Sequence, residues 1–115
     1  MRYLPGFLLL MAVVFSCTHP TVRMKGYEVH GIDVSHHQSR IIWDSVAAQE
    51  IHFAFVKASE GVSLNDSLYC FNWDEMKRVG IRRGAYHFFR PSFPAEEQVE
   101  NFAFQVEMAY GDLPP

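Results

Sequence analysis

The fold of this chain follows most directly from residues 53–61, Phe-Ala-Phe-Val-Lys-Ala-Ser-Glu-Gly. This segment begins as a nearly continuous apolar run and ends in ionisable residues. Two further runs of the same character, residues 29–35 and 84–89, lie on either side of it, and segments with helical spacing separate the three. Apolar strands that alternate with amphipathic helices are typical of parallel βαβ units. The sequence therefore predicts an α/β domain built on a parallel sheet.

Polar side chains gather where the predicted strands end. In a parallel α/β fold the carboxyl ends of the strands meet at one edge, where ligands bind and chemistry takes place. Five ionisable or hydrogen-bonding residues would lie at that edge: Asp33, Lys57, Glu60, Tyr86 and His87. The pattern predicts a polar functional site.

The remaining elements follow from periodicity and from helix-end signals. Strands are expected over about 28–35, 52–57 and 83–89, a loop over 58–65, a helix start near 41–46, and helices over 66–79 and 95–110. Asp66 is expected as the N-cap of the first long helix, with Gly80 and Gly111 closing the two helices and Pro94 opening the second. The tail, residues 112–115, would lead into a fourth strand. Three βα units leave a sheet edge unpaired, so the chain is interpreted as the first part of a closed barrel.

Composition narrows the possible functions. The 115 residues suffice for one small domain, and 49% of them are hydrophobic, so a core can form. The net charge is −3 and no stripe of Lys and Arg is present, which argues against nucleic acid binding. The sequence has no glycine-rich phosphate loop, and no cofactor is predicted.

The first residues predict a targeting signal rather than part of the fold. Arg2 precedes an apolar run that ends in Ser16-Cys17, so residues 1–17 resemble a secretory signal of the bacterial lipoprotein type. A membrane-spanning helix would need about 20 apolar residues. Cys17 would carry the lipid, residues 18–26 would be a tether, and residues 27–115 would form the domain. The expected location is the cell envelope, lipid-anchored outside the cytoplasmic membrane. Ordinary signal cleavage near Cys17, giving a secreted or periplasmic protein, is the alternative.

The predicted edge residues each allow two interpretations. Asp33 lies between two apolar strand residues, where a carboxylate needs a polar cavity or hydrogen bonds. It is therefore either a cleft carboxylate or a cap for loop amides. Glu60 is either a cleft residue or the partner of Lys57, whose ammonium group on a buried strand requires a carboxylate. His87 is an edge residue or a core histidine, and it alternates with Tyr86, so the two point inward together only if the strand end bends.

Two other features, an adjacent pair of histidines and a cysteine, could suggest a metal site or a catalytic thiol, but the sequence pattern favours neither. His36 and His37 are adjacent, and on an extended chain adjacent side chains point to opposite faces, so no metal site is predicted. Cys70 lies among apolar residues and is expected to be a small buried side chain rather than a catalytic thiol.

Several ordered segments resemble glycoside hydrolase family 25, the lysozymes that act as β-1,4-N-acetylmuramidases. They are Gly31-Ile32-Asp33-Val34-Ser35-His36-His37-Gln38, Trp43, the run over 53–61 with Asp66, Arg83-Gly84-Ala85-Tyr86-His87-Phe88, and residues 95–102. The resemblance spans nearly all of residues 27–115. Ser39 departs from it, because the family often has Gly or Pro there. The resemblance implies an irregular β/α barrel of the TIM-like class, of which this chain holds about the first three βα units.

The resemblance also implies roles for particular residues. Asp33 would be a cleft carboxylate, Glu60 a second catalytic candidate, and Tyr86, His87 and Lys57 candidates for substrate binding. In the family a Leu-Pro-Pro segment is followed by a strand with an Asp-x-Glu pair, whose Glu is the general acid. Here residues 113–115 are the last, so the expected general acid would lie beyond Pro115.

The function implied is hydrolysis of the β-1,4 bond between N-acetylmuramic acid and N-acetylglucosamine in peptidoglycan, as part of cell-wall catabolism. Because that chemistry needs two groups, this chain is expected to be an inactive fragment. A non-catalytic glycan-binding remnant at the envelope is the alternative. The expected partners are peptidoglycan strands and, through Cys17, the membrane; no protein partner is predicted.

Overall fold

The computed structural model describes residues 25–115. The predicted signal segment, the lipidated Cys17 and the tether up to residue 24 lie outside the described residues. No helix within residues 25–115 has the length and apolar character needed to cross a membrane.

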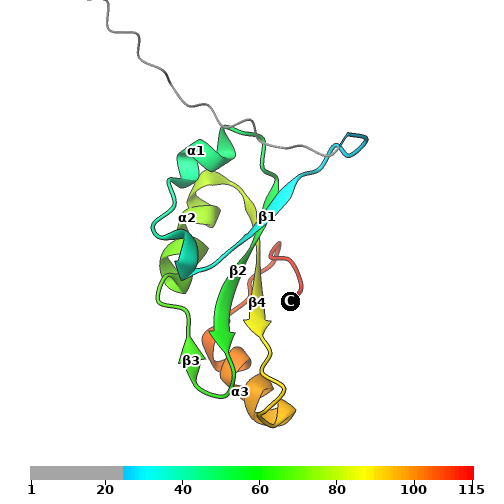
Figure 1. Cartoon of the computed structure of the whole chain (residues 1–115). Coiled ribbons are helices and arrows are strands. Elements are labelled where there is room, and N and C mark those ends of the chain that lie inside the picture. The colour runs from blue at the N-terminus through cyan, green and yellow to red at the C-terminus, as the bar shows by residue number, and fades with distance from the viewer. Residues whose placement is uncertain (1–24) are drawn as a thin grey trace, which may run out of the picture.

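A four-stranded mixed sheet forms the centre of the molecule (Figure 1). β2 (Phe53–Glu60) lies in the middle and pairs in parallel with β1 (Gly31–Val34) and with β4 (Arg82–Phe88). β3 (Leu64–Asn65) pairs antiparallel with the end of β2. The alternation of strands and helices is confirmed, but the sheet is mixed rather than wholly parallel. The described residues form an open sheet, so closure into a barrel stays a prediction.

The predicted loop over residues 58–65 is wrong in its first part. β2 continues to Glu60, and the chain then turns at Gly61, whose φ is +55°, so that β3 returns alongside the strand end. The apolar run had suggested that the strand ends at Lys57. Pairing with β3 and β4 extends it, because both neighbours supply hydrogen-bond partners to residues 59 and 60.

The helices cover one face of the sheet. α1 (Trp43–Ala47) and α2 (Tyr69–Val79) lie together beside it, and α3 (Ala95–Gln105) lies near the end toward which β2 and β4 point (Figure 1). Trp43 and Met76 are fully buried against the small β2 side chains Ala54, Val56 and Ala58. The Trp43 Nε1–H donates to Asn72 Oδ1 at 3.0 Å, which holds α1 against α2. Small strand residues thus allow two helices to approach the sheet closely.

The buried face of α2 contains a polar side chain as well as apolar ones. It consists of Tyr69, Asn72, Trp73 and Met76, a spacing of one helix face. Cys70 falls outside this face and is exposed, so the prediction of a buried cysteine is wrong. Gly80 closes the helix with φ +80°, as predicted. The helix begins three residues after Asp66 rather than at it.

The predicted helix over 95–110 ends early, at Gln105, and Val106 is extended. Asp112 explains the change, because its carboxylate pairs with Arg83 Nε at 2.7 Å and accepts the Ala109 N–H at 2.8 Å. Both side chains of the Arg83–Asp112 pair are 8% exposed. This contact draws the last residues toward β4, where the Leu113 N–H donates to the Arg83 carbonyl. Gly111, with φ +95°, lies in a turn beyond the helix rather than at its end.

Candidate functional site

The sheet face opposite the helices carries the predicted site residues other than His87. Residues paired across neighbouring strands share a face, and Asp33 pairs with Phe55 while Tyr86 pairs with Lys57. Two residues apart on β2, Phe55 and Lys57 lie on the same face, and Glu60 joins them as shown below. We call this surface the open face. Its members are Asp33, Phe55, Lys57, Glu60, Tyr86 and Phe88.

Glycine makes room for the aromatic part of this face. A Cβ on Gly84 would overlap the Phe55 ring, and a Cβ on Gly31 would overlap the Phe53 ring. The two rings meet edge to face, with centroids 6.2 Å apart. Each ring therefore leans over the glycine of a neighbouring strand instead of standing out from the sheet. A side chain at either glycine would force the rings away.

Asp33 is exposed on the open face near Tyr86. Among residues 25–115 no hydrogen bond or ion pair involves its carboxylate, so the structure does not support the alternative in which it caps loop amides. Burial raises the pKa of the Tyr86 hydroxyl, and the negative charges of Asp33 and Asp66 raise it further. The structure thus brings Asp33 and Tyr86 to one site, as the sequence predicted.

A bulge places Glu60 beside Lys57. Tyr86 pairs with Lys57 but His87 pairs with Ser59, so Ala58 is an extra residue in β2. Without the bulge, residues 57 and 60 would point to opposite faces. With it, the buried Lys57 ammonium donates to Glu60 Oε2. Of the two interpretations of Glu60, the structure shows the pairing with Lys57.

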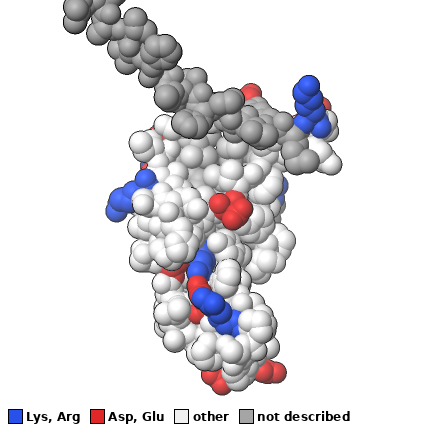
Figure 2. All heavy atoms as spheres, in the orientation of Figure 1, with Lys and Arg blue, Asp and Glu red and all other residues white. Residues whose placement is uncertain are grey.

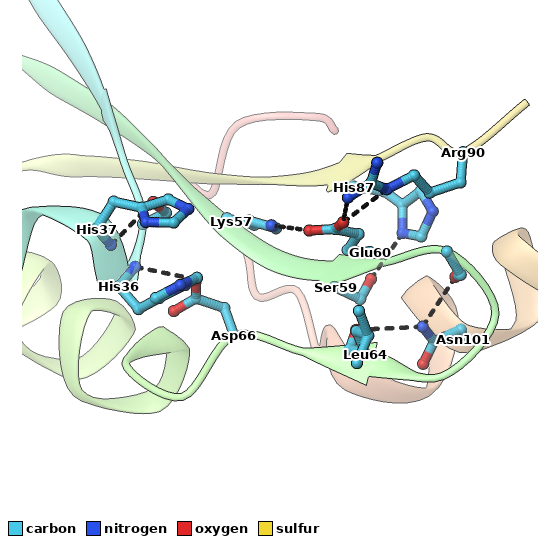
Figure 3. Close-up of polar contacts among 12 residues, drawn as sticks. His36, His37, Lys57, Ser59, Glu60, Leu64, Asp66, His87, Arg90 and Asn101 are labelled. Carbon is cyan, nitrogen blue, oxygen red and sulfur yellow. Dashed lines mark hydrogen bonds and ion pairs between the residues drawn. The ribbon is translucent and has the colours of Figure 1, made fainter.

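Arg90 completes this cluster from the segment after β4. Its Nε–H donates to Glu60 Oε1 at 2.7 Å and its Nη2 donates to the same oxygen, so Glu60 lies between two cations (Figure 3). The hydrogen bonds from Lys57 and Arg90 hold the pKa of the Glu60 carboxyl below its usual range. Phe88 contacts both cations, at 5.0 and 5.2 Å from its ring centroid. On the face shown in Figure 2, positive and negative side chains alternate in small patches, and no large patch carries a single sign of charge.

His87 turns away from Tyr86, toward α3. Its Nδ1 lies 2.8 Å from Ser59 Oγ and its Nε2 lies 3.2 Å from Gln98 Oε1. The Phe102 ring packs edge-on against it at 6.1 Å. These are the contacts of a satisfied core histidine, and the structure does not bring His87 to Asp33. Its role in substrate binding stays a prediction.

His36 and Asp66 join two loops at the rim of the same site. Asp66 Oδ2 accepts the His36 N–H at 3.0 Å and lies 2.7 Å from its Nδ1, while Oδ1 accepts the Leu68 N–H. Burial alone would raise the pKa of the Asp66 carboxyl, but these hydrogen bonds outweigh burial and lower it. Asp66 therefore stays ionised and fixes His36 (Figure 3).

The expected divergence of His36 and His37 is wrong. Residues 36–38 form a 3₁₀ turn, η1 (His36–Gln38), in which the two rings lie 4.0 Å apart. Adjacent side chains point to opposite faces on an extended chain but not in this turn. Within the described residues no group of three His, Cys, Asp or Glu side chains is placed to hold a metal ion.

Two residues of the site region and one contact outside it could not be predicted from the sequence. Arg90 comes just after the end of β4, the strand that contains His87. This position near a strand end was the only feature of the sequence that pointed to Arg90. Gln98 is a polar residue on α3, yet it is only 1% exposed, because its amide group hydrogen-bonds to the turn before the helix. Asp112 pairs with Arg83 over a separation of 29 residues, and no periodicity reports such a contact.

Comparison with known proteins agrees with this geometry. The family model "Glycosyl hydrolases family 25" matches residues 32–115. The uncharacterized protein YegX of Escherichia coli K12 is 43% identical over 93 residues, covering 76% of this chain and 34% of that protein. Lysozyme M1 of Streptomyces globisporus is 47% identical over 64 residues, covering 56% of this chain and 22% of the lysozyme.

The fold matches solved structures as well. A family 25 glycosyl hydrolase from Bacillus anthracis superposes with a TM-score of 0.78 at 36% identity, covering 86% of this chain and 46% of that one. The chain therefore spans about a third or less of the curated relatives named above and under half of this solved chain.

Proposed function

The chain belongs to glycosyl hydrolase family 25, and from this membership we propose that its open face is part of the substrate cleft of a peptidoglycan lysozyme. The bond cleaved is the β-1,4 linkage between N-acetylmuramic acid and N-acetylglucosamine. Family membership and the likeness to Lysozyme M1 support this class of reaction.

One observation carries the proposal: within residues 25–115 the Asp33 carboxylate has no cationic partner, and it lies on a face lined by aromatic side chains. An ionised carboxylate stabilises the positive charge that develops on the sugar as the glycosidic bond breaks. Aromatic rings such as Phe55 and Tyr86 offer flat surfaces for sugar faces. Tyr86, beside Asp33, has a hydroxyl that would bind a sugar hydroxyl.

Glu60 does not supply the second catalytic group in this proposal. Glycosidases need an acid that is protonated when it meets the leaving oxygen. Lys57 and Arg90 hold the pKa of Glu60 low, so this carboxyl is ionised at neutral pH. The general acid would instead come from the Asp-x-Glu pair that the family resemblance implies. Residues 25–115 by themselves would then bind glycan without cleaving it.

A binding and turnover assay tests this division of roles. We expect the 115-residue chain to sediment with purified, insoluble peptidoglycan and to release no reducing ends above the protein-free background. Lysozyme M1 assayed alongside shows that the substrate is cleavable. New reducing ends of muramic acid would contradict this division of roles, and failure to sediment would contradict the proposed cleft.

We also propose that Cys17 anchors the protein at the cell envelope through a lipid. The Cys17→Ala variant, expressed in a bacterium and labelled with a radioactive fatty acid, is expected to lose the label and to leave the membrane fraction. The Cys70→Ala variant is the matched control, because Cys70 lies in the folded domain. Label retained by the Cys17 variant would reject the anchor in favour of a secreted or periplasmic protein.

A further inference from the structure

Arg90 has no role in the proposed chemistry at Asp33. Even so, hydrogen bonds fix both its guanidinium group and its backbone. Two of its guanidinium N–H groups donate to Glu60 Oε1. Its backbone N–H donates to Gln98 Oε1 at 2.8 Å, and its carbonyl accepts from Gln98 Nε2 at 2.9 Å. Because Gln98 is 1% exposed, these bonds fix the backbone to the buried side of α3.

The guanidinium is nonetheless open to a ligand. The Arg90 side chain is 52% exposed, and a guanidinium has five N–H donors, of which Glu60 engages two. Lys57 and Arg90 share one carboxylate, so the cluster carries one net positive charge. A pre-positioned guanidinium with unused donors suits a carboxylate, which it can bind through two parallel hydrogen bonds.

A hollow of about 390 Å³ lies beside Arg90, between the turn that joins β2 to β3 and the segment after β4. Val62, Leu64 and Phe93 form most of its wall, and Arg90 and Glu60 are its charged members. An apolar wall next to a cation matches a ligand group in which a methyl group lies beside a carboxylate.

The hollow lies some distance along the sheet from Asp33, where the glycosidic bond would be cleaved. Asp33 pairs with Phe55, whereas the strand position beside Arg90 is Glu60, five residues further along β2. Because Ala58 is a bulge, the same interval on β4 is four residues, Gly84 to Phe88, which at a rise of about 3.3 Å per residue is about 13 Å along the open face. A group bound by Arg90 would therefore belong to a neighbouring part of the glycan strand.

We propose that Arg90 determines specificity by binding the carboxylate of the substituent that distinguishes N-acetylmuramic acid from N-acetylglucosamine. That substituent is a lactyl ether, which has a methyl beside its carboxylate, and in intact peptidoglycan it is extended by a peptide that can end in alanine with the same pair of groups. The inference rests on the proposed function, because it assumes that a glycan strand lies on the open face.

The test compares three ligands by titration calorimetry with the full chain. Chitotetraose has the sugar backbone and no carboxylate, peptide-free glycan strands expose the lactyl carboxylate, and peptide-bearing strands expose only peptide carboxylates. We expect Arg90→Gln to weaken binding of at least one muramic acid ligand by about tenfold and to leave chitotetraose unchanged. Arg90→Lys, which keeps the charge and the pairing with Glu60, should lose less.

Arg82→Gln is the matched control, since Arg82 is an exposed arginine at the opposite end of β4. If Arg90→Gln loses affinity only for peptide-free strands, Arg90 binds the lactyl carboxylate. If it loses affinity only for peptide-bearing strands, Arg90 binds a carboxylate of the peptide. An unchanged affinity for both muramic acid ligands, or an equal loss with all three ligands, overturns the inference. Wild-type binding of chitotetraose without preference for either muramic acid ligand also overturns it, while leaving the glycan cleft intact. Absence of binding to every ligand overturns the proposed cleft itself, and this inference with it.

Discussion

Replacing Asp33 by Asn is expected to lower the rate of glycosidic bond hydrolysis about 100-fold to 1,000-fold with the fold retained. Asn has nearly the same shape and can still accept a hydrogen bond, but it has no charge to stabilise a cationic transition state. Because no described residue pairs with the Asp33 carboxylate, its loss leaves no partner stranded and should cost little stability.

The measurement needs an active enzyme that contains this segment. Residues 32–115 can replace the matching part of the family 25 hydrolase from Bacillus anthracis, whose fold superposes on this chain with a TM-score of 0.78. Reducing ends released from peptidoglycan give the rate, and circular dichroism checks the fold. Asp74→Asn is the control, because Asp74 is an exposed carboxylate on α2. Full activity of the Asp33→Asn chimera would reduce Asp33 to a structural role.

Replacing Glu60 by Gln is expected to lower the free energy of unfolding by about 3 kcal/mol, the cost of breaking a buried ion pair. The Lys57 side chain is 7% exposed and the Glu60 side chain 11% exposed, so the variant would leave the Lys57 ammonium buried without a counter-ion. Urea unfolding of the same chimera, followed by tryptophan fluorescence, gives the free energy of unfolding.

Glu75→Gln is a matched control, because Glu75 also pairs with a cation three residues away, Arg78, but at the surface. It should lose far less, since solvent screens exposed pairs. Equal losses in the two variants would show that the Lys57–Glu60 pair is not special. A fall in catalytic rate without a fall in stability would instead make Glu60 a catalytic group.

The Glu60 pair also gives stability a defined pH dependence. The folded-state pKa of Glu60 lies below its ordinary value of 4.5, so the folded protein releases this proton more readily than the unfolded chain. The stabilisation is therefore complete above about pH 4.5 and is lost as the pH falls through the lowered pKa. The difference between wild type and Glu60→Gln should shrink over that range, and a constant difference would contradict the cause assigned to the shift.

The sequence alone predicted the alternation of strands and helices and the identity of the edge residues. Apolar runs mark β1, β2 and β4 because aliphatic and aromatic side chains favour strands. Asp33 stands out because a carboxylate inside such a run is costly unless it has a function or a partner. These are local properties, so a single sequence contains them.

Only the tertiary structure decided which edge residues share a face. The side-chain period of a strand is two, so the single extra residue at Ala58 moves Glu60 to the side of Lys57. No apolar pattern marks that bulge. The same alternation sends Tyr86 toward Asp33 and His87 toward α3, where Ser59 and Gln98 satisfy the ring.

Contacts between distant segments account for the remaining differences. Arg90 joins Glu60 across 30 residues, and Asp112 joins Arg83 across 29, ending α3 early. Hydrophobic periodicity indicates which face of a single segment is buried. An ion pair between distant residues depends instead on which two segments lie side by side in the folded protein. The sequence therefore predicted some candidate site residues, such as Asp33 and Tyr86, but it missed Arg90. It did not give their pairing either, because pairing depends on sheet register and on packing between elements far apart in the chain.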